Sequence, residues 1–216
     1  MSAIVVSVLT IKGGQTKTTT AVNVARGLRK LGATVQGLDL NREQANFASF
    51  DDTLEGVKIR LSTAGRIARM RARAATQYII VDNPPSVAKD PIIALLNSDL
   101  VIAPIVPEAL AATGLEGLMQ VVEAIRDPER QANPNLKFRI LISKHEPKDP
   151  NFAAEEKRIR DEFGNLVWPD TILRTPIVNE SIYKGQSILD YAPRTEPARI
   201  YRAISSYIFG EFPPHG

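Results

Sequence analysis

A short segment near the N-terminus carries two lysines, a glycine pair and a run of threonines: Lys12-Gly13-Gly14-Gln15-Thr16-Lys17-Thr18-Thr19. A glycine pair lets backbone N–H groups approach an anion, because no side chain keeps the anion at a distance. A lysine ammonium neutralises phosphate oxygens, and a threonine hydroxyl directly after it is a ligand for Mg²⁺. The spacing therefore predicts a phosphate cradle in which Lys17 reaches the β- and γ-phosphates and Thr18 binds the metal.

The segments on either side of this loop are suited to hold it. The run from Ala3 to Leu9 is short and rich in β-branched residues, which predicts a strand buried on both faces of a parallel sheet. From Thr18 onward, apolar residues recur every three or four positions and predict a helix with one packed face. The loop thus precedes a helix, whose free N–H groups and dipole favour an anion.

Strand and helix patterns alternate along the rest of the chain. Further strands are predicted at 33–40, 57–61, 78–81, 100–106, 138–142 and 171–173, and helices at about 64–76, 113–126, 152–163, 178–184 and 197–209. This alternation implies right-handed crossovers and a mostly parallel twisted sheet with helices on both faces. The 216 residues contain no linker, repeat or low-complexity tract, so residues 1–216 are predicted to form a single α/β domain of the P-loop type.

Two acidic residues stand where predicted strands end. Asp39 closes the second strand, and Asp82 follows the run Tyr78 to Val81. Open α/β sheets bind ligands at this edge, and a carboxylate there can hold Mg²⁺ directly or through water. Asp82 is therefore the predicted second metal residue beside Thr18, although an aspartate in such a place can also serve as a helix cap or turn residue.

Composition excludes several classes of function. The chain has no cysteine, which rules out a disulfide framework, thiolate-bound zinc, iron–sulfur clusters and a cysteine nucleophile. No basic segment followed by a long apolar run precedes the first strand, so neither a signal peptide nor a membrane span is predicted, and we expect a cytoplasmic protein. The net charge of +3 allows contact with nucleic acid without requiring it.

Several motifs together resemble one family. The segment from Lys12 to Thr19 is similar to the deviant Walker A motif of ParA-type ATPases, Lys-Gly-Gly-x-x-Lys-Thr/Ser, and Asp82-Asn83-Pro84-Pro85 resembles that family's Asp-x-Pro-Pro. The runs 101–108 and 113–118 resemble the strand and helix that follow, and the similarity extends to about Phe209. The chain is thus similar to short ParA-family partition ATPases that lack an N-terminal helix-turn-helix.

The resemblance implies roles for particular residues. Lys12 stands at the position of the family's signature lysine, which reaches across a homodimer to the partner's ATP in the manner of an arginine finger. The segment 172–193 is similar to the one that carries adenine-side and dimer contacts, which implies nucleotide contacts at Arg174, Pro176 and Asn179. The implied cofactors are ATP and Mg²⁺, and ATP is expected to promote dimerisation.

The chain departs from the family pattern after the second strand. Relatives carry Asp-x-Asp-Pro-Gln there, whereas this chain reads Asp39-Leu40-Asn41-Arg42-Glu43-Gln44, so Asn41 stands at the position of the aspartate that orients the attacking water or accepts its proton. An amide can hydrogen-bond water but cannot accept a proton. Slow basal hydrolysis is therefore predicted, with Asp39, Asn41, Lys12 and Lys17 as the catalytic candidates. Glu43 is a possible substitute for the missing carboxylate.

Thr16 is a second departure from the standard phosphate-binding loop, which carries glycine before the lysine. A β-branched residue tolerates positive φ only with strain, so the loop either keeps φ negative at Thr16 or stores energy there.

The distribution of basic residues bears on DNA binding. By resemblance, Arg174, Lys184, Arg194, Arg199 and Arg202 lie where similar proteins place a nonspecific DNA surface. Arg66, Arg69 and Arg73 recur on one face of a predicted helix, a pattern that usually marks a solvated face. The proline-bearing tail 209–216 cannot form a basic amphipathic membrane helix, so no membrane partner is predicted.

Two functions remain open at this stage. One is an ATP-dependent dimerising switch that binds nonspecific DNA, associates with the nucleoid and positions a cargo, with hydrolysis stimulated by a ParB-like or adaptor partner. The other is a nucleotide-binding regulatory module in which Asn41 has removed useful catalysis. A metabolic P-loop enzyme of the amidoligase type is disfavoured because the remaining chain has no room for a separate substrate domain.

Overall fold

A twisted sheet of six parallel strands forms the centre of the computed structural model, which describes residues 2–73, 76–129 and 132–214. The strands are β1 (Ile4–Val8), β2 (Val35–Asp39), β3 (Val57–Leu61), β4 (Tyr78–Asp82), β5 (Leu100–Ile105) and β6 (Lys137–Ile142). Their order across the sheet is β3-β2-β4-β1-β5-β6, and every pairing is parallel. The predicted fold class, a P-loop α/β domain with a mostly parallel sheet, is confirmed.

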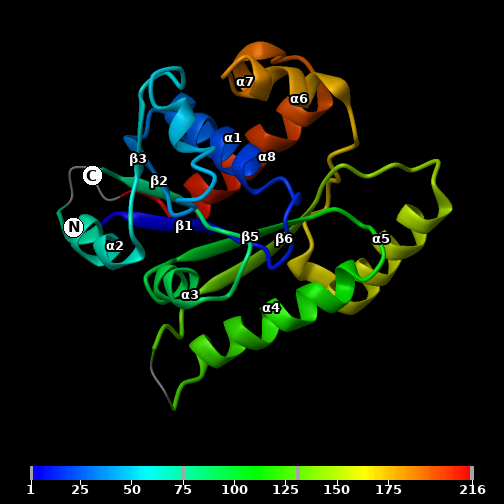
Figure 1. The fold of residues 1–216 in the computed structure, drawn as a ribbon, viewed down its shortest axis with the longest axis horizontal. Helices are drawn as coiled ribbons and strands as arrows, with labels where there is room; N and C mark the ends of the chain where they lie inside the picture. The colour runs from blue at the N-terminus through cyan, green and yellow to red at the C-terminus, as the bar shows by residue number, and fades with distance from the viewer. Residues whose placement is uncertain (1, 74–75, 130–131, 215–216) are drawn as a thin grey trace.

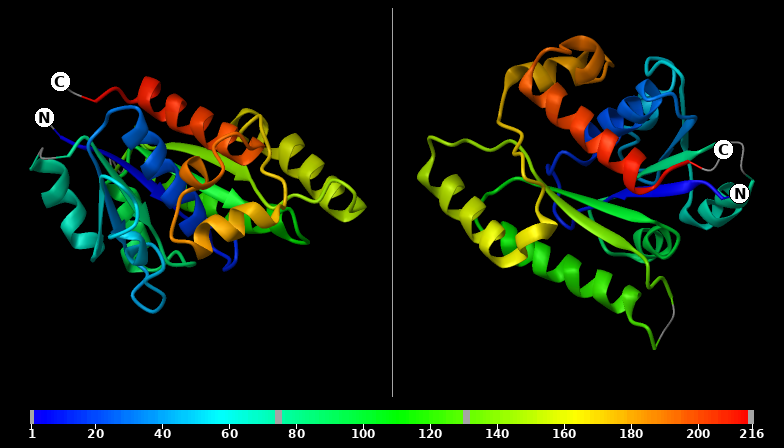
Figure 2. Two further views of the ribbon diagram at one scale, coloured as in Figure 1. Left: turned by 90° about the horizontal axis from the view of Figure 1, so that it is seen from above. Right: turned by 180° about the vertical axis from the view of Figure 1, so that it is seen from behind.

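Helices cover both faces of this sheet (Figures 1 and 2). One face carries α1 (Lys17–Lys30), α6 (Pro176–Tyr183), α7 (Ile188–Tyr191) and α8 (Glu196–Glu211), and the other carries α2 (Ile67–Ala72), α3 (Lys89–Leu96), α4 (Ala111–Arg126) and α5 (Pro150–Phe163). Among the described residues, three single-turn 3₁₀ helices lie at Ala48–Phe50, Ala64–Arg66 and Gly164–Leu166.

Alternating side chains of the central strands divide the core between these two layers. Val6 and Val8 of β1 pack with the α1 and α8 side, whereas Val5 packs with α2 and α3 and Leu9 packs with α4. All four side chains are fully buried. The continuous apolar run of β1 therefore reflects burial on both faces, and this packing fixes the start of the loop that follows.

The sequence-based prediction was wrong in four local places, one of which is the short helix α7, which it did not include. Residues 171–173 form no strand, because Leu173 makes only an isolated bridge to His145. The helix expected over 64–76 consists of a 3₁₀ turn and the short α2, which ends at Ala72, and positions 74 and 75 lie outside the described residues. Helix α3 was not predicted, because it follows a proline-rich turn and has a further proline, Pro91, in its first turn.

Candidate nucleotide site

The loop between β1 and α1 places Thr18 against Asp82, which ends the neighbouring strand β4. The Thr18 hydroxyl donates to Asp82 Oδ2 over 2.6 Å. Thr18 lies in the first turn of α1 and β4 is hydrogen-bonded to β1, so two packed elements fix this contact. The structure thereby brings together the two residues predicted to hold Mg²⁺.

The second oxygen of Asp82 is suited to bind a cation. Oδ1 is buried, and no donor among the described residues lies within hydrogen-bond distance of it. Burial raises the pKa of Asp82 to about 7, assisted by the charge of Asp39 and opposed by the Thr18 hydrogen bond and the Lys17 ammonium. A divalent cation would supply the missing positive partner, so the donor set of one hydroxyl and one carboxylate fits Mg²⁺.

Lys17 lies at the floor of the cradle. Its Nζ approaches Thr10 Oγ1 at 3.4 Å, and burial lowers the pKa of the Lys17 ammonium although the Asp82 charge raises it. At Gly13 and Gly14 an added Cβ would meet no atom within 4 Å, so the space above the loop is open. Gly14 has φ +76°, a conformation that favours glycine. These features leave backbone N–H groups accessible to phosphate oxygens.

Two side chains of the loop tie it to the rest of the sheet. Gln15 is buried, and its Oε1 accepts the Val106 N–H at 2.5 Å, just beyond the end of β5. Thr16 has φ +59°, so the loop adopts the strained alternative, and its hydroxyl is 2.7 Å from that of Ser143 beyond β6. Only the backbone of Gln15 is therefore free for a phosphate, and the contact between Thr16 and Ser143 offsets part of the backbone strain.

Asp39 has a structural position. It is fully buried, and its carboxylate accepts three backbone N–H groups, those of Asn41 at 2.9 Å, Phe47 at 2.9 Å and Ala48 at 3.0 Å. Burial raises the pKa of Asp39 while these hydrogen bonds lower it. The residue therefore shapes the loop that presents Asn41, and a direct catalytic role for Asp39 stays a prediction.

Asn41 lies in an open groove at the carboxyl edge of the sheet. Its Oδ1 accepts the Gln44 N–H at 3.3 Å, and the groove is also lined by Glu43, Pro84 and Pro85. The amide is partly exposed and beside the proline-stiffened turn after Asp82. The structure thus places Asn41 at the same sheet edge as Asp82, and its contact with an attacking water stays a prediction.

The Lys12 ammonium is paired with a carboxylate of the segment that follows β5. Its Nζ pairs with Glu108 Oε2 at 3.2 Å, and both side chains are about half exposed. Ile11 and Leu110 are exposed apolar residues beside this pair, and Leu110 is 74% exposed with φ +67°. The lysine is therefore accessible from outside the protomer.

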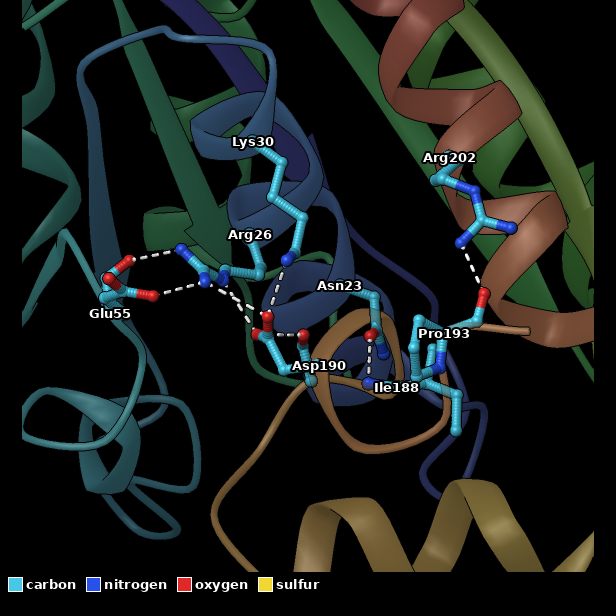
Figure 3. Close-up of polar contacts among 9 residues, drawn as sticks. Asn23, Arg26, Lys30, Glu55, Ile188, Asp190, Pro193 and Arg202 are labelled. Atoms are coloured by element: carbon cyan, nitrogen blue, oxygen red, sulfur yellow. Dashed lines mark hydrogen bonds and ion pairs between the residues drawn. The ribbon is translucent and has the colours of Figure 1, made fainter. Parts of the chain in front are cut away.

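An ion-pair network centred on the buried guanidinium of Arg26 anchors the segment that follows α6 to helix α1 (Figure 3). Arg26 Nε donates to Asp190 Oδ2 at 2.7 Å, and its other nitrogens reach the side chain and carbonyl of Glu55. Asn23 Oδ1 accepts the Ile188 N–H at 2.8 Å. Burial raises the pKa of Asp190, but hydrogen bonds from Arg26, Lys30 and Ser187 outweigh it and hold the value at about 2.

The remaining predicted residues lie along this C-terminal region. Arg174, Pro176 and Asn179 are exposed at the start of α6, and Arg174 pairs with Glu146 at 2.5 Å. Arg199 pairs with Asp170 and Glu196, and Arg202 donates to the Pro193 carbonyl at 2.7 Å (Figure 3). Lys184 and Arg194 are exposed. Nucleotide and DNA contacts at these positions stay predictions.

Several site residues were missed by the sequence reasoning. Thr10 bridges the Lys17 ammonium and the Lys12 carbonyl, and Asn83 donates to the Val8 carbonyl while its Oδ1 is buried without a partner among the described residues. Glu108, the partner of Lys12, was also missed. Thr10 and Asn83 lie within two residues of strand ends, a signal that was available, whereas the pairing of Glu108 with Lys12 depends on loop geometry.

Other classes of site are not supported in the described part of the chain. No group of three or more His, Asp or Glu side chains is arranged there to hold a metal ion. None of its helices combines the length and apolarity needed to cross a bilayer.

A parallel sheet with a glycine loop opening α1 and a buried aspartate on the adjacent strand defines a P-loop nucleotide-binding protein. Comparison with known proteins identifies the family. Residues 6–188 match the family model described as the CobQ/CobB/MinD/ParA nucleotide binding domain, and the chain belongs to this family.

Relatives and solved structures agree with this assignment. The chain is 26% identical over 255 residues to the chromosome partitioning protein ParA of Caulobacter vibrioides, covering 95% of this chain and 94% of that protein. It is 31% identical over 136 residues to uncharacterised proteins of Mycobacterium tuberculosis, of which it spans only 42%. The fold matches apo McdA from Cyanothece with a TM-score of 0.78 at 15% identity, covering 93% and 98% of the two chains.

Proposed function

We propose that this chain is a Mg-ATP-dependent ATPase of the ParA type that dimerises with ATP, binds DNA without sequence preference and positions a cargo in response to a partner protein. The observation that carries the proposal is the Thr18–Asp82 contact, with a buried and unpartnered carboxylate oxygen beside the Lys17 ammonium. Relatives named as chromosome-partitioning proteins, including the ATPase Soj of Thermus thermophilus at 26% identity, support the cellular role.

Different groups of the cradle would have different roles in phosphoryl transfer. Backbone N–H groups of residues 13–18 would hold phosphate oxygens, and Lys17 would neutralise charge on the β- and γ-phosphates. Mg²⁺, held by Thr18 and by Asp82, would supply charge neutralisation between the same phosphates. A structure bound to an ATP analogue exists for a similar fold, a putative plasmid partition protein of Borrelia burgdorferi with a TM-score of 0.75 at 17% identity.

The hydrolytic step depends on Asn41 and on a second protomer. Asn41 would orient the attacking water without accepting its proton, so turnover would be slow. Lys12 would leave Glu108 and reach the nucleotide of the partner, because exposed ion pairs cost little to break. The dimer would then complete both sites.

Sedimentation tests the dimer. ATP with Mg²⁺ should shift the wild type to a dimer, and Lys12→Ala should abolish the shift. Lys157→Ala on α5 provides the control, because it removes an exposed lysine whose ion pair, within the described part of the chain, is with Asp161 on its own helix. An unchanged ATP-dependent dimer in Lys12→Ala would remove the lysine from the mechanism.

The second candidate function is a regulatory module in which ATP acts as a static ligand. The amide at Asn41 specifically favours it, because general-base contributions of roughly 10²–10⁴-fold are missing. Phosphate release at steady state, measured with DNA and the cognate partner, separates the two. A stimulated rate supports the ATPase switch, and a rate that stays at background under all conditions supports the static module.

A further inference from the structure

A groove lined by four arginines runs along the β3 edge of the sheet. Its volume is about 360 Å³, and it is lined by Arg60 of β3, by Arg66, Arg69 and Arg73 around α2, and by neutral residues such as Ser62 and Thr76. All four arginines are exposed. No aspartate or glutamate lines it, and none of the four makes an ion pair with a described residue. We call these four residues the α2 arginine cluster.

The α2 arginine cluster carries a large share of the protein's excess positive charge. Its four positive charges exceed the net charge of the whole protein, which is +3. Arg71, on the same helix, is turned to the protein instead and pairs with Asp99 at 2.6 Å. Unneutralised arginines on one surface create a local positive potential that attracts a polyanion.

The C-terminal basic surface differs in this respect. Carboxylates already neutralise Arg174 and Arg199, and Arg202 is turned to a backbone carbonyl. Only Lys184 and Arg194 of the predicted set lack such a contact among the described residues. Counting only residues that the structure describes, the α2 groove thus holds four unpaired arginines and no carboxylate, against three cations without a carboxylate partner in the C-terminal set, and this difference favours the groove as a surface for phosphates.

We propose that the α2 arginine cluster is the main surface by which this protein holds the phosphate backbone of duplex DNA. The inference rests on the proposed function, since it assigns a place to the DNA binding proposed above. Residues 66, 69 and 73 span about 10 Å along the chain at the helical rise of about 1.5 Å per residue, a length that faces several backbone phosphates. Arginine forks bind phosphate oxygens in pairs, and contacts to phosphates alone give no sequence preference.

The groove is connected to the nucleotide site through strands β2 and β4. Ser62, which lines the groove, donates its backbone N–H to the Asp39 carbonyl at 2.9 Å. Asp39 is aligned with Asp82 across the β2–β4 pairing. DNA on this edge would therefore lie against β3, the neighbour of the strand β2 that ends in Asp39.

The test is the salt dependence of DNA binding, measured by fluorescence anisotropy with a labelled random-sequence duplex, Mg²⁺ and an ATP analogue. The variant is R66Q/R69Q/R73Q, which leaves Arg60 to protect the edge strand from pairing with other chains. A control of equal charge change is K148Q/K157Q/R158Q, at and before α5, at the opposite end of the molecule from α2 (Figure 1). K184Q/R194Q tests the C-terminal surface.

Each lost phosphate contact lowers the slope of log affinity against log salt by about 0.9, so the α2 variant should lose roughly 2–3 in slope and bind at least about tenfold more weakly at moderate salt. The α5 control should retain the wild-type slope. R66K/R69K/R73K should recover most of the slope, since lysine keeps the charge.

Two outcomes contradict the inference in distinguishable ways. Wild-type affinity and slope in the α2 variant, with loss in K184Q/R194Q, would overturn the α2 surface and leave the proposed function standing. Absence of DNA binding by the wild type at low salt would overturn both.

Discussion

Replacing Asp82 with asparagine should make the nucleotide-free protein more stable while removing its Mg²⁺ response. In the folded chain burial raises the Asp82 pKa to about 7, whereas the unfolded value is near 3.8. Folding therefore favours the protonated carboxyl. The resulting penalty is absent below about pH 4, grows by about 1.4 kcal/mol per pH unit up to about pH 7 and is constant above it.

The size of the effect follows from these two pKa values. The penalty at about pH 7.5 is on the order of 4 kcal/mol, and Asp82→Asn removes it. The variant places an amide NH₂ where Oδ1 lacks a hydrogen-bond partner, and a buried unsatisfied donor costs about 1–3 kcal/mol. A net gain of about 1–3 kcal/mol remains, which corresponds to a rise of roughly 2–12 °C in Tm for a chain of this size.

Urea unfolding in EDTA measures this gain. The advantage of Asp82→Asn over wild type should shrink by about 2–3 kcal/mol when the pH falls from about 7.5 to about 5, because the wild-type penalty fades over that interval. Mg²⁺ with an ATP analogue should stabilise the wild type and have little effect on the variant. A variant less stable than wild type at about pH 7.5, with a pH-independent difference, would refute the reasoning.

Three further predictions concern the loop, the base and the anchor. Asn41→Asp should raise kcat by up to roughly 10²-fold in phosphate-release assays if the missing carboxylate limits turnover, and an unchanged kcat would show that it does not. Thr16→Val should lower the free energy of unfolding in urea by about 1–2 kcal/mol, because it removes the contact with Ser143. Thr16→Gly should stay within about 1 kcal/mol of wild type, because relief of the backbone strain at φ +59° offsets that loss. Equal losses in the two variants would argue against strain at this position. Asp190→Asn should lower the free energy of unfolding by about 1–2 kcal/mol, a value that allows for solvent screening of this partly exposed carboxylate. Because the pKa of Asp190 is lowered to about 2 in the folded chain, the stability advantage of the wild type should be present above about pH 4 and vanish toward pH 2.

The residues fixed by backbone pattern were predictable from sequence. The apolar run ending in Leu9 and the glycines at 13 and 14 place a loop at a helix N-terminus, and Asp82 follows directly from a strand end. Parallel neighbours end at one edge of a sheet, so Thr18 and Asp82 were expected to meet, and they do at 2.6 Å.

Features set by tertiary packing could not be read from the chain. No local sequence pattern indicates that the Gln15 side chain contacts Val106. Likewise, no local pattern indicates that Lys12 pairs with Glu108, which lies 96 positions away. The pattern of Arg66, Arg69 and Arg73 predicted an exposed helical face, but the shared groove with Arg60 depends on the position of β3 at the sheet edge. Whether a basic residue is free or neutralised is likewise a property of its neighbours in space.

The central claim is that the loop from Lys12 to Thr19 binds a Mg-nucleotide with Asp82. Isothermal titration of ATP and a slowly hydrolysed analogue into the wild type, with Mg²⁺ and with EDTA, tests it most directly. We predict binding that requires Mg²⁺, is lost in Lys17→Ala and persists in the α5 variant Lys157→Ala. No binding of either nucleotide by the wild type, or equal binding by Lys17→Ala, would contradict the account.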